Sequence, residues 1–331
     1  MAQLTGKTVI VTGSSRGVGA DTAQILAAEG ANVVVNYRSK APRAAKIVTS
    51  IEEAGGKAIA VQADVTNTAD LQNLVQTAVD TYGSLDYLVL NASGGMESGM
   101  GEDYAMRLNR DAQLELARLA AQKMLAGGRI VFVTSHQAHF IREVQTMAEY
   151  QPVAESKRAG EDALVAEIPA LAQKGISLVI VSADMIEGTV TATLLNRLHP
   201  GAIEARRETA GKLYTVNEFA HEVAKMVTAE VESGHVELVA DNQVLTGNIS
   251  VDSISNINMT LKNNSTFNGM ISIVPNVEGG EKYKTNADVF IAAGSTWNLT
   301  GNSTLTSLYN LGTINYNGYT ITLADGTVMK E

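Results

Sequence analysis

The sequence contains no cysteine, and aromatic residues make up only 5% of its 331 residues. Without cysteine, the chain can form neither a disulfide framework nor a thiolate metal site. No uninterrupted apolar run reaches membrane-spanning length, and residues 1–7 lack a basic stretch followed by an apolar one. We therefore expect no membrane partner, no export signal and a cytoplasmic location.

Positive charge is also scarce, because 25 Lys and Arg stand against 35 Asp and Glu, for a net charge of −10. An acidic surface repels phosphate backbones, so nucleic acid is not an expected partner. The histidines show no metal-ligand spacing, and we expect no metal site. These five residues are His136, His139, His199, His221 and His235.

Composition changes near residue 243. Every arginine and every histidine lies before it, whereas residues 244–331 are dominated by Asn, Thr, Ser and Gly. This change predicts two domains, one over 1–243 and a second over 244–331, which we call the C-terminal segment.

The first domain alternates short apolar runs with amphipathic stretches. This alternation is typical of a parallel sheet covered by helices on both faces, and it predicts an α/β fold with a doubly wound sheet, the Rossmann fold. A ligand of such a fold lies at the carboxyl ends of the strands. The predicted strands are 8–12, 32–36, 58–62, 87–91, 129–134, 177–181 and 236–239, and the clearest helices are 20–29, 69–81, 104–124, 154–172 and 216–231.

The C-terminal segment shows period-two hydrophobicity and an internal echo. The stretch that begins at Leu261 and ends at Phe267 is similar to 291–297 and to 299–305, each with a Ser-Thr pair before an apolar residue. Short polar strands with Asn and Gly turns predict a small all-β, solenoid-like segment. Its texture weakly resembles bacterial β-helix surface proteins. A structural or adhesive role and an unnatural fusion of two reading frames both remain open.

A glycine-rich loop links the first predicted strand to the first helix, in the sequence Thr12-Gly-Ser-Ser-Arg-Gly-Val-Gly19. Gly13 allows a tight turn, Gly17 lets the backbone approach a pyrophosphate, and Gly19 allows close helix–strand packing. The helix N-terminus then presents N–H groups and partial positive charge to the phosphates. The loop therefore predicts a dinucleotide site.

The spacing of this loop resembles that of the short-chain dehydrogenase/reductases, and the resemblance covers about 1–240. Asn91-Ala-Ser-Gly94 is similar to the Asn-Asn-Ala-Gly motif of the family, with Leu90 and Ser93 as departures. The resemblance implies an oxidoreductase that transfers hydride between NADP(H) and a carbonyl or secondary alcohol. The residues it implies for the cofactor are Thr12, Gly13, Ser15, Arg16, Gly17, Val18, Gly19, Tyr37, Arg38, Asp64, Val65, Asn91, Ala92, Ser93, Lys157 and Thr189.

The choice of cofactor depends on the residues after the second strand. NAD enzymes usually place an acid there for the ribose 2′-hydroxyl, but this chain has Tyr37 and Arg38. Arg38 and Arg16 could hold a 2′-phosphate through charge-assisted contacts, although both could also be solvated surface residues. We predict NADP.

The resemblance implies a catalytic Ser135, Lys157 and Asn109, but the tyrosine of the family is displaced. Tyr should stand four residues before the lysine, where this chain has Val153. The nearest tyrosine is Tyr150, seven residues before Lys157 and two before Pro152, a residue that favours a helix start. We predict that Tyr150 folds back from a loop and donates the proton.

Two alternatives to this assignment stay open. Tyr150 could serve packing alone, in which case the protein would be an impaired, nucleotide-sensing relative. His136 or His139, beside Ser135, could supply the proton instead.

The substrate and the assembly are less constrained. Residues 186–213, which we call the lid, should shape the pocket, and they mix apolar residues with Arg197, Arg206 and Arg207. We expect a small-molecule carbonyl or alcohol substrate. The family resemblance implies a homodimer or homotetramer that pairs through the helices at 104–124 and 153–172.

Overall fold

The computed structural model describes residues 4–97, 99–101, 103–253, 255–275 and 286–331. Residues 1–3, on which the expectation for the N-terminus partly depends, lie outside the described residues. No helix in these ranges is both long and apolar enough to cross a membrane.

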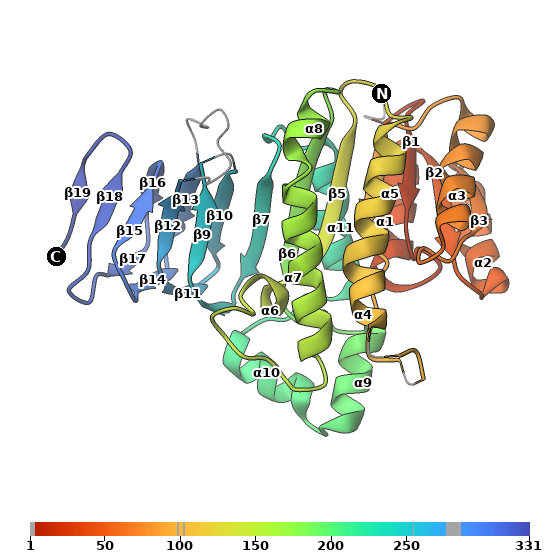
Figure 1. Cartoon of the computed structure of the whole chain (residues 1–331). Coiled ribbons are helices and arrows are strands. Elements are labelled where there is room, and N and C mark those ends of the chain that lie inside the picture. Colours follow the sequence, from red (N-terminus) through yellow and green to blue (C-terminus); the bar gives the residue numbers. More distant parts are fainter. Residues whose placement is uncertain (1–3, 98, 102, 254, 276–285) are drawn as a thin grey trace.

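The centre of the molecule is a ten-stranded sheet in which every neighbouring pair is parallel (Figure 1). The strand order is β16-β13-β10-β7-β6-β5-β4-β1-β2-β3, so the chain reverses direction of winding between β1 and β4. The first seven strands match the predicted ones. They are β1 (Thr8–Val11), β2 (Asn32–Tyr37), β3 (Lys57–Gln62), β4 (Tyr87–Leu90), β5 (Arg129–Ser135), β6 (Ser177–Ala183) and β7 (His235–Asp241).

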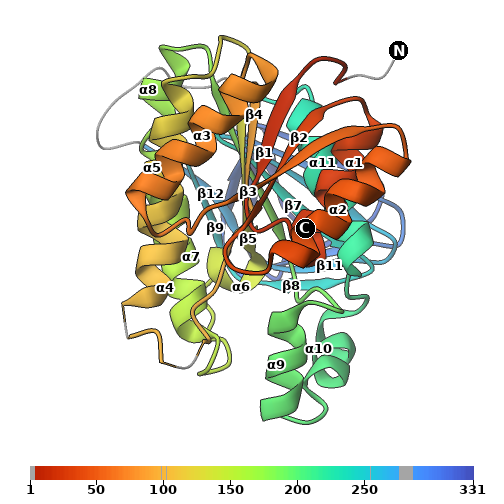
Figure 2. The ribbon, with the colours of Figure 1, turned by 90° about the vertical axis from the view of Figure 1, so that its right-hand side faces the viewer.

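Helices cover both faces of these seven strands, as Figure 2 shows, with α1, α2 and α11 on one face and α3, α5 and α7 on the other. Strands β1, β2, β4, β5 and β6 are almost wholly buried because apolar side chains pack on both faces, whereas the edge strand β3 is partly exposed. The doubly wound α/β prediction is confirmed. The helices are α1 (Gly17–Ala28), α2 (Ala41–Glu53), α3 (Thr68–Tyr82), α4 (Tyr104–Met106), α5 (Ala112–Ala121), α6 (His136–His139), α7 (Gln151–Val165), α8 (Ile168–Ala172), α9 (Val190–Leu198), α10 (Ala202–Ala210) and α11 (Val216–Thr228).

Two stretches predicted as continuous helices are interrupted, which corrects the sequence analysis. The stretch 104–124 contains a π-helical turn, η1 (Arg107–Asp111), between α4 and α5. The stretch 154–172 divides into α7 and α8, because Pro169 favours a new helix start there. Pro169 is a sequence signal of the second break that the sequence analysis did not use.

The C-terminal segment is all-β, as predicted, and it continues the central sheet. Strand β7 pairs with β6 on one side and with β10 on the other, over the full register from Val236↔Ile257 to Asp241↔Lys262. Its strands are β8 (Val244–Thr246), β9 (Ile249–Asp252), β10 (Ile257–Lys262), β11 (Thr266–Gly269), β12 (Ile271–Val274), β13 (Ala287–Ile291), β14 (Thr296–Leu299), β15 (Ser303–Leu305), β16 (Ser307–Asn310), β17 (Thr313–Asn315), β18 (Ile321–Leu323) and β19 (Val328–Met329).

Successive turns of the chain stack in this segment as coils, and the first coil is β7, β8 and β9. Strands β8, β11, β14 and β17 form a second parallel sheet, and β9 pairs with β12. Apolar residues alternate inward, so Phe267 and Trp297 lie in contact with ring centroids 5.7 Å apart. The apolar side chains that point inward from successive coils fill the interior.

The internal echo corresponds to stacking only in part. The stretches 261–267 and 291–297 lie in register, with Leu261 opposite Ile291 and Phe267 opposite Trp297. The third copy, 299–305, is offset, because Leu299 pairs with Gly269 and Leu305 with Leu323. The Ser-Thr pair there lies on a different side of the coil, where Ser303 accepts a hydrogen bond from the Ile271 amide at 3.1 Å.

Candidate active site

The glycine-rich loop lies where β1 leads into α1. Gly13 and Gly17 adopt φ of +63° and +59°, which side chains rarely tolerate. A Cβ on Gly19 would lie 2.5 Å from the side-chain nitrogen Nδ2 of Asn91 and 2.9 Å from the Gly13 carbonyl oxygen. A Cβ on Gly17 would meet nothing within 4 Å. The loop is therefore packed tightly against the sheet below and is open above, as a phosphate cradle requires.

Polar side chains fix the loop from beneath. Asn36 accepts a hydrogen bond from the Gly13 amide at 3.0 Å and donates to the Ala63 carbonyl at 3.1 Å. Asn91 donates to the Thr12 carbonyl at 2.9 Å, and the Thr12 hydroxyl accepts from the Ala92 amide. Asn36 was not among the predicted site residues; the only signal in the sequence was a polar residue near the end of the apolar strand β2.

The N-terminus of α1 carries no capping side chain and no acidic residue in its first turn. Its N–H groups and partial positive charge are thus directed at the open side of the loop. Arg16 is the N-cap residue and is exposed, with Ser15 beside it and Val18 in the first turn.

Four of the residues predicted for the cofactor lie at or just after the ends of β2 and β3, and they are Tyr37, Arg38, Asp64 and Val65. Tyr37 ends β2, and the exposed Arg38 donates a hydrogen bond to the Tyr104 hydroxyl at 2.6 Å. Asp64 accepts hydrogen bonds from both the amide and the hydroxyl of Thr66, and Val65 is buried. Arg38 therefore has a partner and is not simply solvated.

A cavity of about 830 Å³ opens at the carboxyl ends of β4, β5 and β6. Of the predicted residues, it brings together Arg16, Val18, Asn91, Ser93, Ser135, Tyr150, Lys157 and Thr189. Tyr37, Arg38, Asp64 and Val65 are not among the residues lining it. Thr189 caps α9, and its hydroxyl accepts from the Ala192 amide at 3.2 Å.

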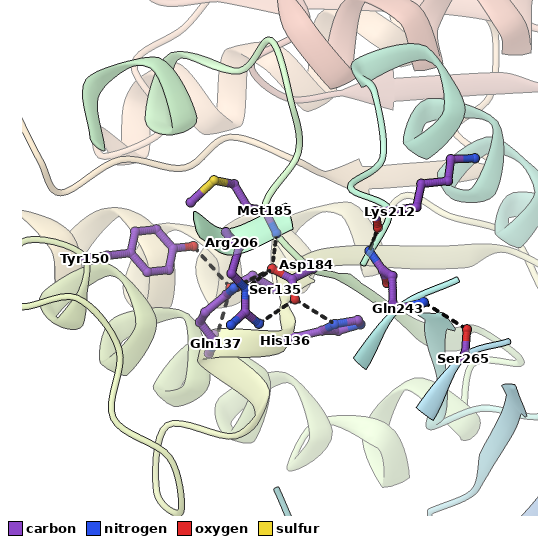
Figure 3. A network of polar contacts seen from close by, with 11 residues as sticks. Ser135, His136, Gln137, Tyr150, Asp184, Met185, Arg206, Lys212, Gln243 and Ser265 are labelled. Carbon is purple, nitrogen blue, oxygen red and sulfur yellow. Dashed lines mark hydrogen bonds and ion pairs between the residues drawn. The ribbon is translucent and has the colours of Figure 1, made fainter. Parts of the chain in front are cut away.

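Tyr150 meets Ser135 at the wall of this cavity. Helix α7 begins at Gln151, so Tyr150 is its N-cap residue and lies outside the helix proper. The Tyr150 hydroxyl lies 3.1 Å from the Ser135 hydroxyl, within hydrogen-bond distance (Figure 3). Ser135 ends β5 and also accepts from the Ala138 amide. The displaced tyrosine therefore reaches the serine from the preceding turn.

Burial changes the proton affinities of both candidate catalytic groups. Burial, with a smaller contribution from the Asp184 charge, raises the pKa of the Tyr150 phenol despite the Ser135 hydrogen bond. Burial lowers the pKa of Lys157 to about 8. Lys157 is 8% exposed and donates to the Val133 carbonyl at 3.2 Å. At neutral pH the site thus contains a neutral phenol and a mostly protonated amine.

Asn109 lies in the π-helical turn η1 and ties three elements together. Its amide nitrogen donates to the Gly94 carbonyl at 2.7 Å and to the Ser156 hydroxyl at 2.9 Å. A Cβ on Gly160 would lie 2.1 Å from the Asn109 carbonyl oxygen, so only glycine lets α7 approach this closely. Asn109 holds the loop after β4 against the helix that carries Lys157.

A buried carboxylate beside Ser135 was missed by the sequence analysis. Asp184 directly follows β6 and forms a two-point ion pair with Arg206 of α10, at 2.9 Å and 2.6 Å (Figure 3). Gln137 donates to the same carboxylate at 2.8 Å. Burial acts to raise the pKa of Asp184, but Arg206 holds it below its usual value. The residues between Asp184 and Arg206 are most of the lid, so the pair closes the lid onto the sheet.

The two histidines near Ser135 differ in their surroundings. His136 is 3% exposed and lies 4.0 Å from Asp184, and burial lowers its pKa to about 4, so its ring is neutral. His139 contacts Glu161 through Nδ1 at 3.0 Å and packs edge-on against Phe140. His139 does not line the cavity, whereas His136 does. Among the described residues, no group of three or more acidic or histidine side chains could hold a metal.

Comparison with known proteins agrees with this geometry. The family model described as short chain dehydrogenase matches residues 7–198, more than half of the chain. An oxidoreductase of Methylorubrum extorquens is 38% identical over 200 residues, which are 58% of this chain and 79% of that protein. A hydroxynaphthalene reductase-like protein of Metarhizium robertsii is 39% identical over 142 residues, or 41% of this chain. The chain spans only 53% of that fungal protein.

Among solved structures, a short chain dehydrogenase from Burkholderia cenocepacia in complex with NADP superposes with a TM-score of 0.62 and 29% identity. The alignment covers 72% of this chain and 97% of that one. The sheet order, the glycine-rich loop and these matches together lead to one conclusion: the chain belongs to the short chain dehydrogenase family.

Proposed function

We propose that the protein reduces a carbonyl compound, or oxidises the matching secondary alcohol, with NADP(H) and with Tyr150 as the proton-transferring residue. The observation that carries this proposal is the 3.1 Å contact between the hydroxyls of Tyr150 and Ser135 at the cavity wall. A phenol and a serine hydroxyl that meet at one point can both contact a single substrate oxygen.

A bound nicotinamide would supply the hydride or accept it. Ser135 donates a hydrogen bond to the substrate oxygen and orients it, and Tyr150 transfers its proton to that oxygen as negative charge develops. Because burial raises the pKa of Tyr150, the phenol is fully protonated at neutral pH and is ready to donate in the reductive direction. In the oxidative direction the same hydroxyl must lose its proton, which burial disfavours.

Lys157 supports this chemistry by its charge. One N–H of its ammonium group donates to the Val133 carbonyl, and Lys157 is among the residues that line the cavity. We infer that the remaining donors of this charged group hold the ribose hydroxyls of the cofactor. Asn109 acts as a positioning residue for the loop after β4 and for α7.

The preference for NADP is supported by the end of β2. No carboxylate stands there for a ribose 2′-hydroxyl; Asn36 is directed inward to Gly13, and Arg38 takes the next exposed position. Arg16, the exposed N-cap residue of α1, lines the cavity. Two guanidinium groups in these places suit a 2′-phosphate.

Tyr150→Phe tests the assignment directly. We expect NADPH to bind with unchanged affinity, measured by fluorescence titration, while turnover of a ketone panel falls by roughly 10²–10⁴-fold. The phenyl ring keeps the packing of the tyrosine, so loss of turnover isolates the hydroxyl.

His136→Asn is the matched comparison, since it removes the other candidate proton donor in the cavity wall. Unchanged turnover in Tyr150→Phe together with a loss in His136→Asn would transfer the role to the histidine. NADPH binding with no oxidation by the unaltered protein would instead favour a nucleotide-binding role without catalysis.

A further inference from the structure

We propose that strand β8 and the corner before it, residues 242–243, are part of the substrate site, where β8 forms one wall of the cavity and the corner fastens the lid. The inference about the wall rests on the proposed function, whereas the inference about the lid can be tested without turnover. It assigns a role in substrate selection to a segment that lies outside the family match at 7–198.

Strand β8 supplies the wall. Val244, Leu245 and Thr246 all line the cavity, together with Phe140 and Val144 from the stretch after β5. The side chain of Leu245 is buried inside the coils, so Val244 and Thr246 point away from the coil interior, on the cavity side. The outward face of β8 in the first coil therefore lines the pocket.

Close packing holds β8 in this place. A Cβ on Gly247 would lie 2.6 Å from the ring of Phe140, and Phe140 belongs to the hydrophobic core of the coils. Phe140 follows α6, whose N-cap is Ser135. One aromatic ring thus connects the coil interior to the helix that begins at the proposed catalytic serine.

The corner between β7 and β8 fastens the lid. The Lys212 amide donates to the Asn242 carbonyl at 2.7 Å, and the Gln243 side chain donates to the Lys212 carbonyl at 2.6 Å (Figure 3). A Cβ on Gly211 would lie 2.1 Å from the Asn242 oxygen, so the chains touch backbone to backbone. Gly211 is the C-cap of α10, which carries Arg206.

Gln243 departs from the pattern of the later coils. Val244, Thr266 and Thr296 lie opposite one another in neighbouring strands. The residues directly before them therefore occupy the same corner of successive coils, and they are Gln243, Ser265 and Ser295. The serine side chains are fully buried within the coils. Gln243 is 1% exposed, yet its longer side chain reaches out of the coil to the lid backbone. The first coil therefore carries a residue suited to the lid contact, where later coils carry one suited to stacking.

Limited trypsin digestion tests the lid contact in the full chain. The lid offers cleavage sites at Arg197, Arg206, Arg207 and Lys212, and its folding against the sheet restricts the access of the protease to them. We expect Gln243→Leu to speed cleavage in the lid by roughly fivefold, the effect of losing one net hydrogen bond. The near-isosteric leucine keeps the corner filled. Ser295→Ala, at the same corner of a later coil, should leave cleavage unchanged.

The wall is tested by Val244→Phe. We expect kcat/KM for a bicyclic ketone such as 1-tetralone to fall about tenfold more than for 2-butanone, because the ring reduces the room for bulky substrates. NADPH affinity should not change. Thr313→Phe is the matched control, since Thr313 is exposed and occupies the register position of Val244 at the outermost coil.

The outcomes separate this inference from the proposed function. Equal cleavage of Gln243→Leu and the unaltered protein, with both folded by thermal melting, would overturn the lid contact. Equal losses on both ketones in Val244→Phe would overturn the wall. If the unaltered protein reduces no ketone, the proposed function fails, and the digestion still decides the role of Gln243.

Discussion

The nucleotide end and the substrate end of the cavity use different means to present polar groups. At the nucleotide end, the backbone of the glycine-rich loop and the first turn of α1 face the ligand, and side chains such as Asn36 act from behind. At the substrate end, the side chains of Ser135, Tyr150 and Lys157 face the cavity themselves.

This difference explains why one end follows its family closely and the other departs from it. A backbone cradle needs glycine at fixed positions, because any Cβ at Gly19 collides with the Asn91 side chain and the Gly13 carbonyl. A side-chain site needs only a hydroxyl at the correct point in space, and Tyr150 delivers it from an N-cap position although Val153 occupies the usual place. The comparison yields four predictions.

The largest effect is expected at the substrate end, in Arg206→Met. The Asp184 carboxylate would stay buried without its ion-pair partner, which typically costs about 3–5 kcal/mol. Urea unfolding should show this loss of stability, and the lid should become sensitive to trypsin. Arg207→Met is the control, since its partner Glu187 is more exposed. Equal losses in the two variants would show that Asp184 does not need Arg206.

The next effect is at the nucleotide end, in Gly19→Ala. The added Cβ must displace Asn91 or the Gly13 carbonyl, and we expect NADPH affinity to fall about 100-fold, as about 3 kcal/mol of misfit implies. Titration calorimetry measures it, with the thermal midpoint as a check on folding. Affinity within twofold of the unaltered protein would contradict the backbone cradle.

A smaller effect separates the two cofactors. Arg38→Ala should weaken NADPH binding by roughly 10-fold to 100-fold, the contribution of a charge-assisted hydrogen bond, and leave NADH nearly unchanged. Because Arg38 also donates to Tyr104, Tyr104→Phe controls for that contact. Equal losses for both nucleotides in Arg38→Ala would remove the basis for NADP.

The smallest effect concerns Lys157, and it is a change of the free energy of unfolding with pH. Its folded pKa of about 8 lies below the ordinary lysine value of 10.5, so the unfolded chain binds more protons between these values. Stability therefore rises with pH across this window relative to Lys157→Met, with a slope of at most about 1.4 kcal/mol per pH unit. Below pH 8 the difference should be constant. A slope of the opposite sign would mean that Lys157 has an anionic partner in the folded state.

Much of this architecture follows from local sequence. The alternation of apolar runs and amphipathic stretches predicted all seven strands of the first domain, because both periodicities are properties of neighbouring residues. The glycine-rich loop was predictable for the same reason. The breaks at η1 and at Pro169 were not predicted, because the helices were assigned from hydrophobic periodicity and Pro169 was given no weight.

The contacts that define the substrate end join residues far apart in the chain. Asp184 and Arg206 are separated by 22 residues, and Gln243 reaches Lys212 over 31. No spacing rule connects such positions, so the sequence named Arg206 as a lid residue but did not reveal its partner Asp184.

What the sequence determined by itself was the order of strands and helices, the loop for a dinucleotide and the all-β character of the C-terminal segment. Tertiary structure alone decided that Tyr150 meets Ser135, that Arg206 closes on Asp184 and that β8 becomes a wall of the cavity. The physical reason is range, because backbone propensity acts within a few residues, whereas these contacts depend on how whole layers pack.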